Sequence, residues 1–104
     1  MVCVSDDELK IIIEIIKTYA SDCDVLVFGS RYRGTHKNYS DLDLAFNCNK
    51  TMSINRIAEL KEAFEESDLP YRVDVLDYNT VSDEFRKIID KGNEKIFRAE
   101  ACTD

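Results

Sequence analysis

The sequence has few of the residues that mark metal–thiolate centres, linkers or repeats. It contains one histidine, no tryptophan, one proline and three glycines, and shows no internal repeat or low-complexity segment. Its four cysteines (Cys3, Cys23, Cys48 and Cys102) include no pair at the spacing of a zinc or redox site. We therefore expect reduced thiols, mostly buried or in a tail, rather than a disulfide or a zinc site.

Long apolar runs are also missing. The longest purely apolar stretch is only a few residues, so we expect no membrane span and no membrane partner. The N-terminus becomes acidic at once with Asp6, Asp7 and Glu8, and it lacks the basic-then-apolar pattern of a secretory signal. These features predict a cytoplasmic protein.

The size and charge of the chain limit its partners. At 104 residues and 12.0 kDa, it is expected to form one domain over residues 1–104, with a frayed tail at 98–104. The net charge of −7 argues against a nucleic-acid-binding surface. The oligomeric state, whether homo- or hetero-oligomeric, stays open at this stage.

Hydrophobic periodicity predicts alternating helices and strands. Helices are expected to begin at Ser5, with Glu8 completing a capping box, at Ser53, and at Thr80 or Ser82, and Gly92 is expected to end the last helix. The inward positions expected for the last two helices are Ile54, Ile57, Leu60 and Phe64, then Val81, Phe85, Ile88 and Ile89.

Strands are predicted at 24–29, 41–46 and 71–77, and 96–97 can add a short docking segment. The link between the first two strands is too short for a comfortable parallel crossover with a full helix. We therefore predict an α+β fold in which helices flank a small mixed sheet.

Three aspartates occupy strand positions in an apolar setting. Asp41 and Asp43 flank one leucine, and because side chains alternate along a strand, their carboxylates share a face about 7 Å apart along the chain. Asp74 lies within the apolar run of the third strand. Three carboxylates this close would repel one another without cations, which indicates a magnesium site and suits two ions that share ligands.

The turn after the first strand has the features of a phosphate-binding turn. Gly29 allows close approach of the backbone, and amides at the start of the short helix beginning at Ser30 can face an anion. Residues 30–40 contain three cations and none of the 21 acidic residues. Of these cations, Arg31 and Arg33 can reach a triphosphate, although a partner's acidic surface would suit them equally well, and the third is Lys37.

Four further residues keep two interpretations each. His36 can be catalytic or simply solvated, and Asp77 can extend the acidic site or begin the turn before the last helix. Tyr32 and Tyr39 can stack on a base or meet a partner, or they can pack in the ordinary way.

The combined motif resembles the signature of the polymerase-β-like nucleotidyltransferase superfamily: Gly29-Ser30, ten residues, then Asp41-Leu42-Asp43. Residues 29–34, 40–44 and 73–77 are similar to those of its minimal nucleotidyltransferases, the antitoxin-type members of HEPN/nucleotidyltransferase toxin–antitoxin pairs. The resemblance covers nearly the whole chain and implies the polymerase-β-like nucleotidyltransferase fold.

The resemblance also implies an activity: magnesium-dependent transfer of a nucleoside monophosphate, usually AMP from ATP, onto a hydroxyl acceptor. Asp41 and Asp43 would be the paired metal ligands, and Asp74 would be the third carboxylate, which orients or deprotonates the acceptor. Gly29 and Ser30 would hold the triphosphate. Members of this group are often encoded with a HEPN-type helical toxin and act as its antitoxin, some by transferring AMP onto a toxin tyrosine.

Two alternatives remain. An antitoxin that neutralises a HEPN-type toxin by contact alone would not need the three carboxylates. A transferase acting on a small molecule or an RNA end would need an acceptor site, and the acidic surface argues against RNA. The sequence leaves open the acceptor, the preferred base and whether the enzyme needs its partner.

Overall fold

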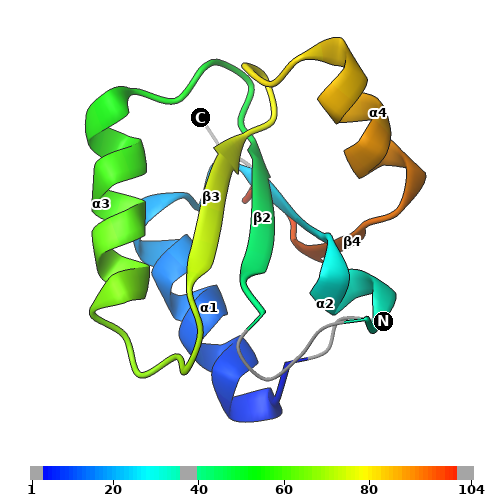
Figure 1. Cartoon of the computed structure of the whole chain (residues 1–104). Helices are drawn as coiled ribbons and strands as arrows, with labels where there is room; N and C mark the ends of the chain where they lie inside the picture. Colours follow the sequence, from blue (N-terminus) through cyan, green and yellow to red (C-terminus); the bar gives the residue numbers. More distant parts are fainter. Residues whose placement is uncertain (1–3, 36–39, 101–104) are drawn as a thin grey trace.

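The computed structural model describes residues 4–35 and 40–100 (Figure 1). Helices and strands alternate along the chain, as the sequence predicts. In chain order they are α1 (Asp6–Tyr19), β1 (Asp24–Phe28), α2 (Ser30–Arg33), β2 (Leu42–Asn47), α3 (Ile54–Glu65), β3 (Val73–Asp77), α4 (Asp83–Lys91) and β4 (Glu94–Phe97). The interpretations of Cys3, His36, Lys37, Tyr39 and Cys102 lie outside the described residues.

The four strands form one mixed sheet in the order β3-β2-β1-β4. β1 is antiparallel to both β2 and β4, whereas β2 and β3 run parallel and are connected through α3. This arrangement confirms the predicted mixed sheet. The segment predicted to dock at 96–97 is part of β4, which forms the edge strand next to β1.

The two faces of the sheet are covered unequally (Figure 1). α1 and α3 pack on one face over the main core, which includes Ile12, Ile16, Leu44, Phe46 and Leu60. α4 covers part of the other face with a smaller cluster of Phe28, Ala45 and Ile89. Because side chains alternate along β2 and β3, Asp43 and Asp74 project on the face of this smaller cluster.

Helix starts follow the sequence closely. Ser5 and Glu8 form the predicted capping box, and Ser82 rather than Thr80 caps α4 by accepting a hydrogen bond from the Phe85 amide. Two expected inward positions are wrong: Ile54 is 85% exposed and Ile88 is 56% exposed. Ile54 is the first residue of α3. In the short α4, Ile89 is buried as predicted, whereas its neighbour Ile88 faces solvent.

Asp77 supports a turn and does not join the acidic site. Asp77 is only 4% exposed, and its carboxylate accepts hydrogen bonds from the backbone amides of Met52 at 2.9 Å and Asn79 at 3.0 Å. It ends β3, three residues after Asp74, on the opposite face of the strand. The structure therefore favours the turn interpretation, in which Asp77 also fastens the loop before α3.

Replacing Asp77 with alanine is expected to lower the free energy of unfolding by about 2–4 kcal/mol, because it leaves two amides without their acceptor. Urea denaturation followed by circular dichroism measures the effect. Asp90→Ala is the control, since the hydrogen bond that Asp90 accepts from the Tyr78 hydroxyl lies at an exposed position. Equal losses for the two variants would contradict this account.

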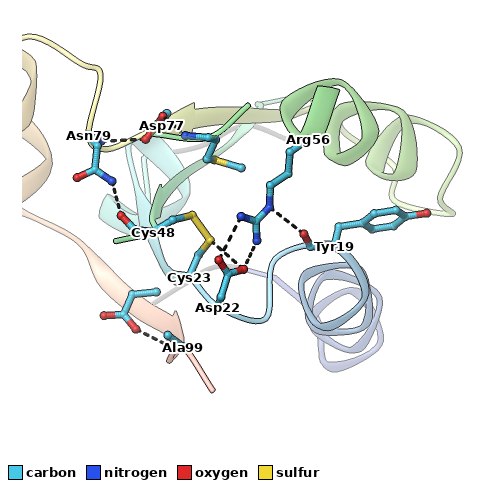
Figure 2. Close-up of a disulfide and its surroundings, with 10 residues drawn as sticks. Tyr19, Asp22, Cys23, Cys48, Arg56, Asp77, Asn79 and Ala99 are labelled. Atoms are coloured by element: carbon cyan, nitrogen blue, oxygen red, sulfur yellow. Dashed lines mark hydrogen bonds and ion pairs between the residues drawn. A yellow bond between two sulfur atoms is a disulfide. The ribbon is translucent and has the colours of Figure 1, made fainter. Parts of the chain in front are cut away.

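Cys23 and Cys48 form a disulfide, which corrects the expectation of reduced thiols (Figure 2). The antiparallel register pairs Asp24 with Asn47, so the next residues outward face each other, with a Cα–Cα distance of 4.2 Å. A separation of 25 residues in sequence gave no sign of this proximity.

Beside the disulfide, Arg56 pairs with Asp22 and thereby ties α3 to the loop between α1 and β1 (Figure 2).

The residues after β4 are held to the start of β1. The Ala99 amide donates to Asp24 Oδ1 at 2.7 Å, and the Glu100 amide donates to the Ser21 carbonyl at 2.8 Å. Ala99 and Glu100, at the start of the tail expected at 98–104, are therefore hydrogen-bonded to the segment around the start of β1, and residues 101–104 lie outside the described residues. None of the described helices combines the length and hydropathy that a membrane span requires.

Candidate active site

Three acidic residues lie at the N-terminal ends of β2 and β3. The parallel register pairs Asp43 with Asp74, so the two side chains lie next to each other on one face of the sheet. Asp41 precedes β2 by one residue, and its charge acts on Asp43. The structure thus brings together the three predicted acids, although β2 begins at Leu42, one residue later than expected.

The surroundings of Asp43 disfavour its charge. Burial raises the pKa of its carboxyl to about 6, and the negative charge of Asp74, a hydrogen bond to Asp74 and the charge of Asp41 act in the same direction. The guanidinium of Arg33 opposes the shift in pKa. A partly buried group of carboxylates with this repulsion suits a hard divalent cation, because Mg²⁺ prefers oxygen ligands and would remove the repulsion.

The Gly29 turn lies directly against this carboxylate group. A Cβ at Gly29 would stand 2.2 Å from Asp43 Oδ2, and the residue has a φ of 80°. Only glycine satisfies both the close approach and the backbone conformation. Ser30 follows as the first residue of α2, so the predicted phosphate-binding turn and the predicted metal ligands are in contact.

Arg31 and Tyr32 both point into the protein. Arg31 is 5% exposed, its guanidinium lies 3.8 Å from the centre of the Tyr71 ring, and its Nε donates to the Ser40 carbonyl at 3.0 Å. Tyr32 packs against Gly92, where a Cβ would lie 2.9 Å from the ring. The structure therefore gives both residues packing contacts that fix α2 on the sheet.

Arg33 differs from Arg31 in its position. It is exposed at the end of α2, and its charge lowers the pKa of Asp43. Of the two arginines predicted to bind nucleotide, Arg33 is thus the one whose side chain is open to solvent beside the carboxylates.

Two hollows adjoin the acids, each of about 460 Å³. The first, the carboxylate hollow, is lined by Phe28, Asp43, Lys61, Asp74, Val75, Leu76 and Phe85. The second, the α3–β3 hollow, is lined by Lys61, Phe64, Glu65, Leu69, Pro70, Tyr71, Arg72, Val73 and Asp74. Their size is that of small-ligand sites.

Sequence reasoning missed Lys61 and Phe85 as residues of this region. Lys61 comes from α3, and its spacing looks like that of any exposed helical lysine. Phe85 was expected only as a core position of α4, yet it meets Phe28 edge to face at 5.9 Å on the wall of the carboxylate hollow. No local pattern in the sequence could have placed either residue in the same hollow as Asp43.

Comparison with known proteins agrees with this geometry. Residues 10–101 match the family described as Polymerase beta, Nucleotidyltransferase. A relative from Haemophilus influenzae, named probable protein adenylyltransferase MntA, is 47% identical over 88 residues, which are 85% of this chain and 77% of the relative.

Solved structures share the fold. A toxin–antitoxin crystal structure with AMP-PNP has a TM-score of 0.74 at 22% identity, over 86% of this chain and 72% of that one. A structure of a tri-AMPylated Shewanella oneidensis HEPN toxin with MNT antitoxin has a TM-score of 0.65 at 19% identity, over 86% of this chain and 68% of that one. The chain therefore belongs to the polymerase β nucleotidyltransferase family and is a nucleotidyltransferase, as its Gly-Ser and Asp-x-Asp signature predicted.

Proposed function

We propose that this nucleotidyltransferase moves AMP from ATP onto a hydroxyl group of a HEPN-type toxin and so acts as the antitoxin. The observation that carries the proposal is the contact between the Gly29 turn and Asp43, which is itself paired with Asp74. The relative named as a probable protein adenylyltransferase supports the protein acceptor. The fold shared with a HEPN toxin–MNT antitoxin complex supports the kind of partner.

Asp41, Asp43 and Asp74 would hold magnesium, with two ions sharing these carboxylates. Bound there, the ions would neutralise negative charge on the phosphoryl oxygens and on the leaving group. The all-oxygen ligand set and the raised pKa of Asp43 fit this role, because the carboxylates repel one another when no cation is present.

The remaining residues of the site position the nucleotide. Gly29 and Ser30 hold the triphosphate through the turn, and Arg33 pairs with phosphate oxygens at its exposed position. Arg31, which was also predicted to bind the triphosphate, would act through its packing on Tyr71, which keeps α2 in place.

The reaction forms a bond between the acceptor oxygen and the α-phosphorus while the bond to pyrophosphate breaks. Pyrophosphate leaves with the electron pair, and the carboxylate of Asp74 accepts the hydroxyl proton. Catalysis then depends mainly on positioning and charge neutralisation. Because ATP is the donor, we place the activity in the cytoplasm.

The test incubates the protein with ATP labelled at the α-phosphate, Mg²⁺ and the purified product of the neighbouring open reading frame. We expect label on that partner, loss of labelling with EDTA, and a fall of about 100-fold or more for Asp41→Ala. Asp7→Ala, which alters an exposed side chain in the first turn of α1, is the control.

Absence of transfer, with Asp41→Ala indistinguishable from the unchanged protein, would overturn the proposal. If Asp41→Ala still protects cells from the toxin as well as the unchanged protein does, neutralisation by contact alone replaces it. If label goes to a small molecule and not to the partner, the acceptor assigned here is wrong.

A further inference from the structure

Asp41 differs from the other two acids of the site because it lies outside the sheet. β2 begins at Leu42, which is also where its parallel register with β3 starts, opposite Val73. Asp43 and Asp74 are paired in that register, so the sheet itself sets their positions. The position of Asp41 must therefore be set by other contacts.

The peptide groups on both sides of Asp41 are hydrogen-bonded. The Ser40 carbonyl, in the peptide group before Asp41, accepts from Arg31 Nε at 3.0 Å. The Leu42 amide, in the peptide group after it, donates to the Arg72 carbonyl at 2.9 Å. Because peptide groups are planar, the two that flank a Cα determine the direction of its Cα–Cβ bond. These two hydrogen bonds therefore set the direction in which the Asp41 side chain leaves the backbone.

Arg31 is itself held in place by a chain of contacts. Its guanidinium lies 3.8 Å from the centre of the Tyr71 ring, and Arg31 is only 5% exposed. The Tyr71 hydroxyl donates to Glu8 Oε1 at 3.1 Å, and the same oxygen accepts from the Ser5 amide in the capping box of α1. The starts of β2 and β3 lie at the same end of the molecule as the start of α1 (Figure 1). Helix α1 is thus connected to the segment before Asp41 through Tyr71 and Arg31.

We propose that Arg31 and Tyr71 are positioning residues of the nucleotidyltransferase, which act through the backbone before Asp41 to hold its carboxylate where it binds the divalent cation. The inference rests on the proposed function for the metal-binding role of Asp41. It adds how the acid outside the sheet is placed, and it gives Arg31 a part in the reaction beyond fixing α2 on the sheet.

A guanidinium suits this role better than an ammonium. It is planar, so its face can lie on an aromatic ring while its N–H groups donate hydrogen bonds in its own plane. An ammonium is a compact charge on a flexible stem and does not fix both contacts at once. The charge that lowers the pKa of Asp43 comes from Arg33, whereas Arg31 supplies a fixed hydrogen bond to the backbone.

The first experiment measures metal binding without any reaction. Mn²⁺, which suits the same oxygen ligands as Mg²⁺, is titrated into the protein, and the free ion is measured by electron paramagnetic resonance. Arg31→Lys and Tyr71→Leu should each weaken Mn²⁺ binding about tenfold or more, because residues that orient a metal ligand affect affinity on this scale. Tyr71→Phe keeps the ring under the guanidinium and should stay within about twofold of the unchanged protein.

Three comparisons separate the placement of Asp41 from other effects. Asp77→Ala is expected to lower stability at the other end of β3 and should leave Mn²⁺ affinity unchanged. Arg98→Lys makes the same exchange of side chains at an exposed position after β4 and should also have no effect. In an Asp41→Asn background, Arg31→Lys should weaken Mn²⁺ binding no further, because both changes act on one ligand. Additive losses in the double variant would overturn the inference.

The second experiment measures transfer of label to the partner protein. Arg31→Lys should lower kcat about tenfold or more at low Mg²⁺, and kcat should recover as Mg²⁺ is raised. The KM for ATP at saturating Mg²⁺ should stay within about twofold. A direct contact between Arg31 and the triphosphate would instead raise this KM and leave Mn²⁺ affinity unchanged, and that result would overturn the inference.

The outcomes also separate this inference from the proposed function. If label is transferred to the partner but Arg31→Lys and Tyr71→Leu bind Mn²⁺ as their controls do, the assigned placement of Asp41 is wrong and the proposed function stands. If no label is transferred while Mn²⁺ affinity falls in both variants, the proposed function fails and the placement of Asp41 holds.

Discussion

Asp43→Asn is expected to lower nucleotidyl transfer about 100-fold or more and, at the same time, to stabilise the metal-free protein at pH 8. The loss of activity follows from removing a charged metal ligand at the centre of the site. The gain in stability follows because Asp43 is partly buried and faces the charges of Asp74 and Asp41. A neutral amide of the same shape removes that repulsion, and active-site groups often destabilise the fold in this way.

The dependence on pH has a definite sign. The pKa of Asp43 is raised from 3.8 to about 6 in the folded protein, so the folded state binds this proton more tightly than the unfolded state. The contribution of Asp43 to stability is therefore fully present below about pH 4 and is lost as the pH rises through about 6. The Asp43→Asn variant lacks this dependence.

Thermal unfolding in EDTA at pH 5 and pH 8 measures the effect. At pH 8 we expect Tm of Asp43→Asn to exceed that of the unchanged protein by about 5 °C, with a smaller difference at pH 5. Added Mg²⁺ should raise Tm of the unchanged protein more than that of the variant. Asp68→Asn, a change in the loop beyond α3, is the control. A variant less stable than the unchanged protein at pH 8 in EDTA would contradict the repulsion we describe.

Gly29→Ala is the second change with a large expected effect. A methyl group there would lie 2.2 Å from Asp43 Oδ2, so the carboxylate or the turn must move. The φ of 80° with ψ of −157° is a conformation that is essentially restricted to glycine. We expect transfer to fall about 100-fold or more and the free energy of unfolding to fall by about 2–4 kcal/mol.

Gly34→Ala separates the two causes. Gly34 ends α2 with a φ of 76°, and no described atom lies within 4 Å of the position its Cβ would take. Alanine there should cost about 1–2 kcal/mol from the backbone conformation alone, with little change in transfer. Urea denaturation gives the stability, and label transfer from ATP gives the activity. Equal losses of activity in both variants would show that contact with Asp43 is not the cause.

Much of the secondary structure and the centre of the site follow from local patterns. The start of α1 is marked by Ser5 with Glu8, and the start of α3 is marked by Ser53. Both could be predicted because helix capping depends on residues close together in the chain. Alternation along a strand is a local property too, and it is enough to predict that Asp41 and Asp43 share one face.

Other features depend on register and packing. Asp77 looked able to extend the acidic site, yet its partners Met52 and Asn79 come from two different segments. Arg31 as a phosphate ligand stays a prediction, and what the sequence did not indicate is that its guanidinium stacks on Tyr71, 40 residues away in the chain. Neither set of contacts could be read from the sequence, because a charged side chain takes the partners that the folded chain places beside it.

The sequence by itself determined the order of helices and strands, the Gly-Ser turn and the three carboxylates, because each depends on residues within a few positions of one another. Only the tertiary structure decided that Cys23 meets Cys48, that Gly29 touches Asp43 and that Lys61 lines the same hollow as Asp74. Those contacts join segments distant in the chain. They follow from the β1–β2 register and from the packing of α3 next to β3, which no short stretch of sequence encodes.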